Sequence, residues 1–297
     1  MNSIGASVAM APPAINPPVE DSLSGIPRQS GLRTRGLSAL VLVPIVLGLT
    51  YLGGAAFSGM LLIVAVLMAY EWNRICGGGA AATGVIVAVA VFAGVGVAAA
   101  GPAEIALAVT VLSAGLAYAV TAAFFGAPQG RPLWLAAGVA YIALPCIAVI
   151  WLRATPQIGL ATILWLLAVV WATDIGAYFA GRGIGGPRLA PRISPKKTWA
   201  GLAGGMIAAG VVGAVTAAVL GLPNTPVLIA LSMALAVVAQ GGDLAESAVK
   251  RHFKVKDSGT IIPGHGGLLD RLDGLLTAAP AVAAVALISG EGVLAWR

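Results

Sequence analysis

The sequence predicts an all-α integral membrane protein with about nine transmembrane helices and two longer cytoplasmic loops that form the functional site. Apolar residues make up 59% of the 297 residues and charged residues only 9%, whereas a soluble domain carries roughly 25% charged residues. The apolar residues also fall into runs close to the roughly 20 residues that cross a bilayer as a helix. Finally, the basic residues gather on one side of the topology that these runs define.

The chain is predicted to divide into a disordered cytoplasmic tail, residues 1–35, and a single polytopic membrane domain, residues 36–297. The tail is rich in Pro, Ser and Gly and has no apolar period, a composition that cannot form a packed core. It lacks the charged start and apolar centre of a cleavable signal peptide, so the first helix is expected to act as an uncleaved insertion signal.

From Gly36 onward the apolar runs follow one another almost without interruption. They are too long for strands and do not alternate in polarity, so helices are expected and strands are not. Abundant Gly and Ala within the runs allow close contact between helices. The nine predicted spans cover residues 37–53, 55–73, 80–100, 103–125, 132–153, 157–180, 199–221, 225–245 and 274–295.

The basic residues predict the orientation of these helices. A nine-helix topology puts 15 of the 17 Lys and Arg residues on the side of the amino terminus and only Arg153 and Arg297 on the other side. Basic residues favour the cytoplasm, so a multi-pass protein of a bacterial-type inner membrane is expected, with its amino terminus inside. The net charge of +6 is therefore assigned to membrane orientation, and no nucleic-acid partner is expected.

Four aspartates are predicted to lie at one depth near the cytoplasmic face. Asp174 and Asp243 stand near the cytoplasmic ends of the sixth and eighth spans, and Asp270 and Asp273 precede the ninth. Carboxylates at membrane depth are costly unless they are paired or coordinated. Mg²⁺ prefers oxygen ligands and often bridges carboxylates to substrate phosphates, so a magnesium site is the favoured interpretation.

Ordinary ion pairs are the alternative for each aspartate. Lys250, Arg251 and Arg271 are available as partners, and Asp273 could simply cap a helix. This explains a single aspartate as well as metal binding does, but it explains four converging aspartates less well, because ionisable groups inside membranes usually serve function.

The loop after the sixth span is predicted to bind substrate through Ser194, Pro195, Lys196, Lys197 and Thr198. This segment leads directly into the seventh span, and backbone N–H groups at a helix start attract phosphate. The order of a Walker P-loop, GxxxxGK[ST], is absent. A positive-inside anchor would explain the two lysines equally well, but not the residues that flank them.

The loop after the eighth span combines Lys250, Arg251, Asp257 and His265 with a glycine-rich turn. The glycines on both sides of His265 clear space for a ligand. Cations for phosphate, carboxylates for Mg²⁺ and a membrane setting together favour phosphoryl or nucleotidyl transfer to a lipid, because such chemistry depends mainly on positioning and charge neutralisation.

Residues 247–273 resemble the signature of the phosphatidate cytidylyltransferases, the CDP-diacylglycerol synthases. The segment reads SAVKR, then four residues, then KDSGTIIPGHGGLLDRLD, and it is similar to that signature at every fixed position. The similarity covers roughly residues 165–275 and includes Asp174 and the segment 194–199, whereas the amino-terminal half matches only in being apolar. Ala200 departs from the family, which often has an acidic residue there.

The resemblance implies that CTP and phosphatidic acid react in the bilayer to give CDP-diacylglycerol and pyrophosphate, with Mg²⁺ required and a monovalent cation sharing the site. It implies that Asp243, Asp270 and Asp273 hold metal and that Lys250 and Arg251 lie near phosphates. The expected catalytic set is Asp243, Lys250, Arg251, Asp257, His265, Asp270, Arg271 and Asp273, and Asp174 is expected to bind substrate together with the segment 194–198.

Two other functions stay open on the sequence. A CTP-dependent lipid kinase, or a cytidylyltransferase for another membrane lipid, would need similar residues. An ion-coupled transporter is less favoured, because transporters place such residues near the bilayer midplane and often contain internal repeats. A homodimer is also left open.

Overall fold

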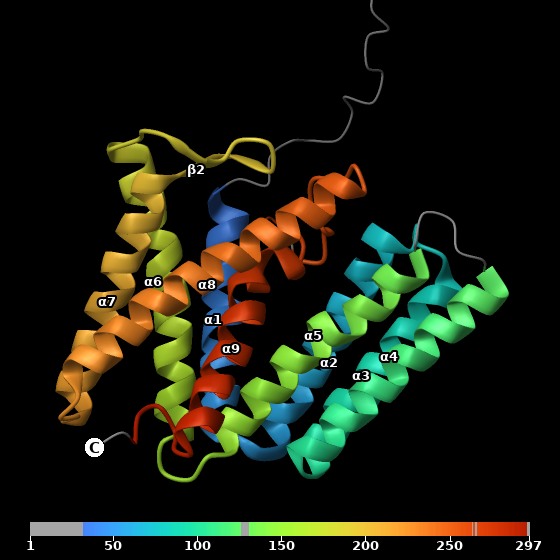
Figure 1. Ribbon diagram of the computed structural model, residues 1–297, viewed down its shortest axis with the longest axis horizontal. Coiled ribbons are helices and arrows are strands. Elements are labelled where there is room, and N and C mark those ends of the chain that lie inside the picture. Colours follow the sequence, from blue (N-terminus) through green and yellow to red (C-terminus); the bar gives the residue numbers. More distant parts are fainter. Residues whose placement is uncertain (1–31, 126–130, 263, 265, 296–297) are drawn as a thin grey trace, which may run out of the picture.

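The computed structural model describes residues 32–125, 131–262, 264 and 266–295. This part contains nine helices and one antiparallel hairpin (Figure 1). The predicted tail covers residues 1–35. Residues 1–31 lie outside the described part of the chain, and residues 32–35 belong to the first helix. The elements are α1 (Leu32–Leu52), α2 (Gly54–Cys76), α3 (Ala81–Ala100), α4 (Ala103–Phe125), α5 (Arg131–Ala154), α6 (Gly159–Gly183), β1 (Arg188–Ala190), β2 (Ser194–Thr198), α7 (Trp199–Leu220), α8 (Thr225–His252) and α9 (Leu269–Ser289).

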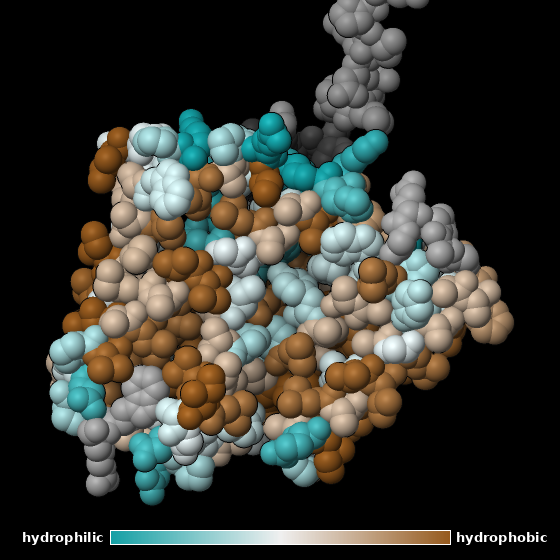
Figure 2. Space-filling model, viewed as in Figure 1, coloured by the Kyte–Doolittle hydropathy of each residue, from teal (hydrophilic) through white to brown (hydrophobic). Residues whose placement is uncertain are grey.

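The surface of the helices is suited to lipid. Helices α2 to α9 are each long and apolar enough to cross a membrane, and α1 contributes the apolar stretch Leu40–Leu52. Large apolar side chains such as Ile288 and Phe124 are 87% and 79% exposed, which water would not tolerate over so wide an area. Figure 2 shows a broad hydrophobic band with hydrophilic residues gathered at the two ends. The prediction of a multi-pass, all-α membrane protein is confirmed.

The helices form two groups that meet at α9. Helices α2 to α5 pack around one buried cluster, which contains Val87 and Val139. Helices α6 to α9 pack around a second cluster, which contains Trp165 and Leu166. Buried Leu269 and Leu276 of α9 join the first cluster, so α9 has a contact face in each group, and Figure 1 shows it between them.

Glycines bring the helices of the second group close together. A Cβ atom on Gly176 of α6 would lie 2.6 Å from the carbonyl oxygen of Gly204 of α7. A Cβ atom on Gly242 of α8 would lie 2.8 Å from the carbonyl oxygen of Asp273 of α9. The absence of side chains at these positions therefore sets the distance between the backbones that carry the candidate site.

The ends of α8 and α9 differ from the predicted spans. Helix α8 continues beyond residue 245 to His252, and α9 begins at Leu269 instead of residue 274. Apolar runs end at the first charged residues, but a helix continues for as long as its backbone hydrogen bonds can form. Lys254 has a φ of 57°, a left-handed conformation in which the helix cannot continue.

The hairpin formed by β1 and β2 is also a departure, because no strands were expected. Arg188 pairs with Thr198 and Ala190 pairs with Ser194. The predicted segment 194–198 is thus extended, although it leads directly into α7 as expected. Thr198 caps α7, because its hydroxyl accepts a hydrogen bond of 3.0 Å from the backbone N–H of Gly201.

Candidate active site

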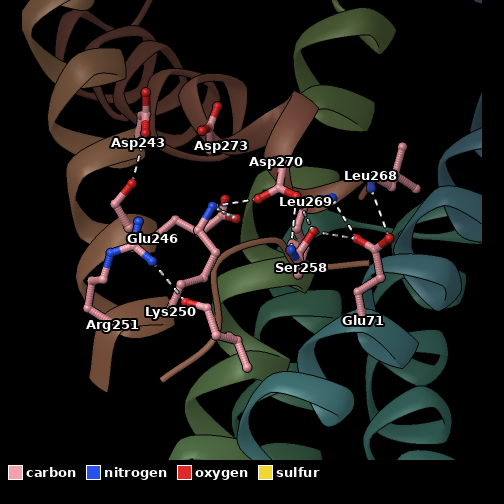
Figure 3. Close-up of polar contacts among 12 residues, drawn as sticks. Glu71, Asp243, Glu246, Lys250, Arg251, Ser258, Leu268, Leu269, Asp270 and Asp273 are labelled. Atoms are coloured by element: carbon pink, nitrogen blue, oxygen red, sulfur yellow. Dashed lines mark hydrogen bonds and ion pairs between the residues drawn. The ribbon is translucent and has the colours of Figure 1, made fainter. Parts of the chain in front are cut away.

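Charged side chains from α8, α9 and the hairpin meet at one end of the molecule. Figure 3 shows the acidic side chains of α8 and α9 in one group, with Lys250 joined to Glu246 of α8 and to Asp270 of α9. The elements that carry these side chains are held together by the glycine contacts between α6 and α7 and between α8 and α9. About half of the predicted site residues lie in or near this group, and the others lie elsewhere or outside the described residues.

One face of α8 carries Asp243, Glu246, Ser247 and Lys250. The spacing of three and four residues puts these side chains on neighbouring turns of the helix. The Ser247 hydroxyl donates to Asp243 Oδ1 at 3.3 Å. Lys250 Nζ lies 3.1 Å from Glu246 Oε1. Because α8 extends to His252, this whole face is helical and is not part of the predicted loop.

Asp270, in the first turn of α9, is held by donors from two segments. Lys250 Nζ lies 2.5 Å from Asp270 Oδ1. The backbone N–H of Ser258 donates to Asp270 Oδ2 at 2.9 Å, and the Ser258 hydroxyl lies 2.9 Å from the same oxygen. This carboxylate therefore connects α8, α9 and the loop between them.

Asp273 follows one turn later on α9 and lies near other acids. Its Oδ1 accepts a hydrogen bond of 2.7 Å from the backbone N–H of Gly274. It lies within electrostatic range of Asp174, Asp243 and Glu246. A group of acids at this depth needs positive charge from a partner to remain ionised together.

The described residues contain no group of three His, Cys, Asp or Glu side chains close enough to hold a metal ion unaided. Two members of the predicted metal-binding set, Asp243 and Asp270, instead have lysine partners. Their oxygens remain the hard donors that Mg²⁺ prefers, and Mg²⁺ commonly takes only one or two carboxylates together with substrate phosphates.

Lys197 connects the hairpin to α8. Its Nζ lies 2.6 Å from Asp243 Oδ2 and donates to the carbonyl oxygen of Gln240 at 3.3 Å. Neighbouring side chains on a strand point to opposite faces, and Lys196 is exposed. The hairpin therefore brings one of the two predicted lysines to the acidic cluster.

Asp174, on α6, also lies at this end of the molecule. Its side chain is exposed and lies within electrostatic range of Asp243, Lys197 and Arg271. Arg271 is exposed on α9. These positions agree with the predicted common depth of the four aspartates.

The remaining predicted residues that the structure describes form no hydrogen bond or ion pair with the acidic cluster. Arg251 is exposed and donates to the carbonyl oxygen of Val255 at 3.0 Å, so it bonds to the backbone just beyond the end of α8. Asp257 is exposed, and Ser194 and Pro195 lie on β2. His265 lies outside the described residues, so its predicted role stays a prediction.

Glu246 was not predicted from the sequence, although it belongs to the cluster. It is 2% exposed. Beyond the Lys250 ion pair, neither of its carboxylate oxygens accepts a hydrogen bond from the described residues. A buried carboxylate of this kind requires a cation. Its position three residues after Asp243 was the signal available in the sequence.

Glu71, from α2 in the amino-terminal half, was also missed. It is fully buried and lies on the other side of Asp270 from Lys250 (Figure 3). Its oxygens accept hydrogen bonds from the backbone N–H groups of Leu268 and Leu269, at 2.9 and 2.8 Å. A charged residue within an apolar run was the available signal, but nothing in the sequence named its partners.

Comparison with known proteins extends the similarity beyond the signature. The model of the cytidylyltransferase family matches residues 33–289. A phosphatidate cytidylyltransferase of Brucella suis is 41% identical over 250 residues, which are 84% of this chain and 91% of that protein. One from Pseudomonas aeruginosa is 36% identical over 274 residues, covering 88% and 99% of the two chains. One from Bacillus subtilis is 47% identical over 130 residues, covering 43% and 48%. The similarity therefore includes the amino-terminal helices.

Proposed function

The chain belongs to the cytidylyltransferase family, and from this premise we propose that it transfers CMP from CTP to phosphatidic acid, giving CDP-diacylglycerol and pyrophosphate. The observation that carries the proposal is the cluster of Asp243, Glu246, Asp270 and Asp273, with lysines reaching it from both the hairpin and α8. Its relatives that carry the name phosphatidate cytidylyltransferase support the choice of lipid.

The proposed reaction joins two polyanions. An oxygen of the phosphatidic acid phosphate attacks the α-phosphorus of CTP, and the bond from that phosphorus to the β-phosphate bridging oxygen breaks. The attacking oxygen is already anionic, so no side chain has to remove a proton. The demand on the protein is to bring the two phosphates together and to stabilise charge on the departing pyrophosphate.

Lys197 and Lys250 are the residues best placed to meet this demand. Each ammonium group has three donors, and each lies within 2.6 Å of a cluster carboxylate. Lys197 reaches the cluster from the hairpin and Lys250 from α8, so they approach from different directions. We assign them to the phosphates of the two substrates, and the carboxylates hold the lysines in place before the substrates arrive.

The donor set also fits Mg²⁺. Asp243, Glu246 and Asp273 supply oxygen ligands, and the hydrogen-bonding capacity of Glu246 is unused apart from its ion pair. Asp270, which the resemblance implies as a metal ligand together with Asp243 and Asp273, belongs to the same proposed site. When bound there, Mg²⁺ would neutralise phosphate charge and orient the transferring group. A monovalent cation in the same acidic cluster is part of this proposal.

We also propose that the site faces the cytoplasm of a bacterial cell, at the inner membrane. The charge asymmetry of the sequence supports this orientation. Arg153, one of the two exceptions, lies at the carboxyl end of α5, where its Nε donates to the carbonyl oxygen of Thr50 in α1 at 2.7 Å. In this orientation CTP enters from water, and phosphatidic acid arrives laterally from the bilayer.

The test is an assay of purified protein with phosphatidic acid and CTP labelled on either the α- or the γ-phosphate. Entry of the α-label into lipid, with release of pyrophosphate, is the expected result. Entry of the γ-label alone would establish the alternative of a CTP-dependent kinase. Equal transfer to a polyprenyl phosphate in a parallel reaction would contradict the assignment of phosphatidic acid as the acceptor.

A further inference from the structure

We propose that Glu71 is a positioning residue, whose carboxylate on α2 caps the amino end of α9 and so holds Asp270 and Asp273 in place. The inference rests on the proposed function, because it assigns Glu71 to the same site. It adds to that site a residue from a helix that carries none of the signature.

The contacts of Glu71 are those of a helix cap supplied by a distant part of the chain. The first backbone N–H groups of a helix have no partner within the helix. Leu268, at the capping position of α9, provides no side-chain hydrogen bond. Glu71 Oε1 instead accepts from the N–H of Leu268 at 2.9 Å, and Oε2 accepts from the N–H of Leu269 at 2.8 Å.

The charge of Glu71 is balanced by α9 itself. The carboxylate is 0% exposed, and none of the ion pairs among the described residues includes it. The amino end of a helix carries partial positive charge, which favours a carboxylate. The buried carboxylate is therefore stabilised by the N–H groups at the start of α9. The same hydrogen bonds hold the first residues of α9 against α2.

Ser258 connects this cap to the acidic cluster. Its hydroxyl lies 3.1 Å from Glu71 Oε2 and 2.9 Å from Asp270 Oδ2, while its backbone N–H donates to Asp270 Oδ2. The hydroxyl has one proton and donates to one of the two carboxylates at a time. Glu71 and Asp270 thus share a donor, so displacement of the first changes the hydrogen bonding of the second.

Two glycines of the signature make room for this arrangement. A Cβ atom on Gly259 would overlap Glu71 Oε1. A Cβ atom on Gly267 would overlap the Ser258 hydroxyl and lie 2.9 Å from Asp270 Oδ2. The loop therefore fits closely over both carboxylates, and this fit gives the two glycines a role that the signature alone does not explain.

Loss of the cap is expected to loosen the first turn of α9, where Asp270 lies. In Glu71→Gln one oxygen remains as an acceptor, but the amide NH₂ faces a backbone N–H that can only donate. Asp270 would then lose its fixed orientation toward Lys250. Asp273, one turn later, would move less.

The experiment compares wild-type protein with Glu71→Gln and with Glu104→Gln. Glu104 is a matched control, because it is an exposed acid in the first turn of α4. Hydrogen–deuterium exchange without metal is measured on peptides that cover Leu268–Asp273. Binding of Mn²⁺ is measured by electron paramagnetic resonance, and kcat and KM for CTP are measured at saturating Mg²⁺.

The expected result for Glu71→Gln is faster exchange at the start of α9 and unchanged exchange in α3 and α4. Mn²⁺ affinity and kcat should each fall by about tenfold to a hundredfold, the usual effect of losing a residue that orients metal ligands. KM for CTP should stay within about twofold of wild type, because neither lysine is replaced and Lys250 keeps its ion pair with Glu246. Glu104→Gln should match wild type throughout.

Two results would overturn the inference. One is wild-type exchange at the start of α9 in Glu71→Gln. The other is faster exchange with unchanged Mn²⁺ affinity and kcat, which would make the cap merely structural. If Glu71→Gln cannot be purified, Gly259→Ala displaces the same carboxylate and takes the same predictions. Failure of the wild-type protein to bind Mn²⁺ or to use CTP would overturn the proposed function, while the exchange measurement would still decide whether Glu71 holds α9.

Discussion

Lys197 of the β hairpin and Asp243 of α8 form an ion pair of 2.6 Å, with side chains 17% and 33% exposed. Within the described residues, this ion pair connects a side chain of the hairpin to a carboxylate of the acidic cluster. It places a cation near the acids before any phosphate is present, and it joins the hairpin to α8 at Asp243, nine residues before the end of that helix.

Replacement of Lys197 by alanine should therefore reduce activity strongly. A hydrogen bond to a charged group contributes about 1.5–3 kcal/mol, so kcat/KM is expected to fall by about tenfold to a hundredfold. Arg192→Ala, at the exposed turn of the same hairpin, is the control and should stay within about twofold of wild type. Equal losses in the two variants would indicate a general effect of hairpin charge.

Asp270→Asn should abolish turnover with little effect on membrane insertion. The amide would turn an NH₂ group toward Lys250 or toward the donors of Ser258, where the wild-type carboxylate accepts from both. We expect a loss of at least about a hundredfold in kcat. The measurement is a Mg²⁺ titration of the purified variant, with the exposed Glu291→Gln as control. Full activity at any Mg²⁺ concentration would remove Asp270 from the site.

The contact between α8 and α9 can be tested at two adjacent glycines. Gly242→Ala puts a Cβ atom 2.8 Å from the carbonyl oxygen of Asp273, whereas a Cβ atom on Gly241 meets nothing within 4 Å. Overpacking of this kind costs about 1–3 kcal/mol, so Gly242→Ala should unfold at a lower temperature in detergent and lose kcat. Gly241→Ala should match or slightly exceed wild type in stability, because alanine favours a helix over glycine.

The proposed orientation predicts from which side of the membrane a reagent can reach each end of the molecule. Cys76 and Cys146 are free but buried, so little labelling of the native cysteines is expected, and labelling of an introduced cysteine can be measured. Arg188→Cys, on β1, should react with a membrane-impermeant maleimide only in inverted vesicles. Glu104→Cys, at the opposite end, should react only in intact spheroplasts. The reverse pattern would place the hairpin outside the cell and contradict entry of CTP from the cytoplasm.

The sequence was sufficient for the membrane architecture, because hydropathy acts locally. Each helix has to satisfy its own backbone in lipid, so long apolar runs identify it without knowledge of its neighbours. The same criterion misplaced the end of α8, since residues 246–252 are mostly polar or charged yet helical. As a result, Glu246 and Lys250 were read as part of a loop, and their shared helical face was not predicted.

The candidate site was predictable only in part, because some of its contacts depend on packing. The aspartates could be placed at one depth from helix direction alone. The partners of Glu71 could not, since they lie 187 to 198 residues later in the chain. The strand geometry of residues 194–198, which separates the roles of Lys196 and Lys197, was likewise hidden because short strands have no lasting apolar period.

The trans cap on α9 has a consequence for biogenesis. A ribosome makes Glu71 long before it makes Leu268, so α2 enters the bilayer while the donors of this carboxylate do not yet exist. Until α9 inserts, the acid has to stay hydrated at the membrane surface or accept hydrogen bonds from other donors. Completion of the site thus has to wait for α9, and a nascent chain that stops just before α9 would carry most of the signature without an organised centre.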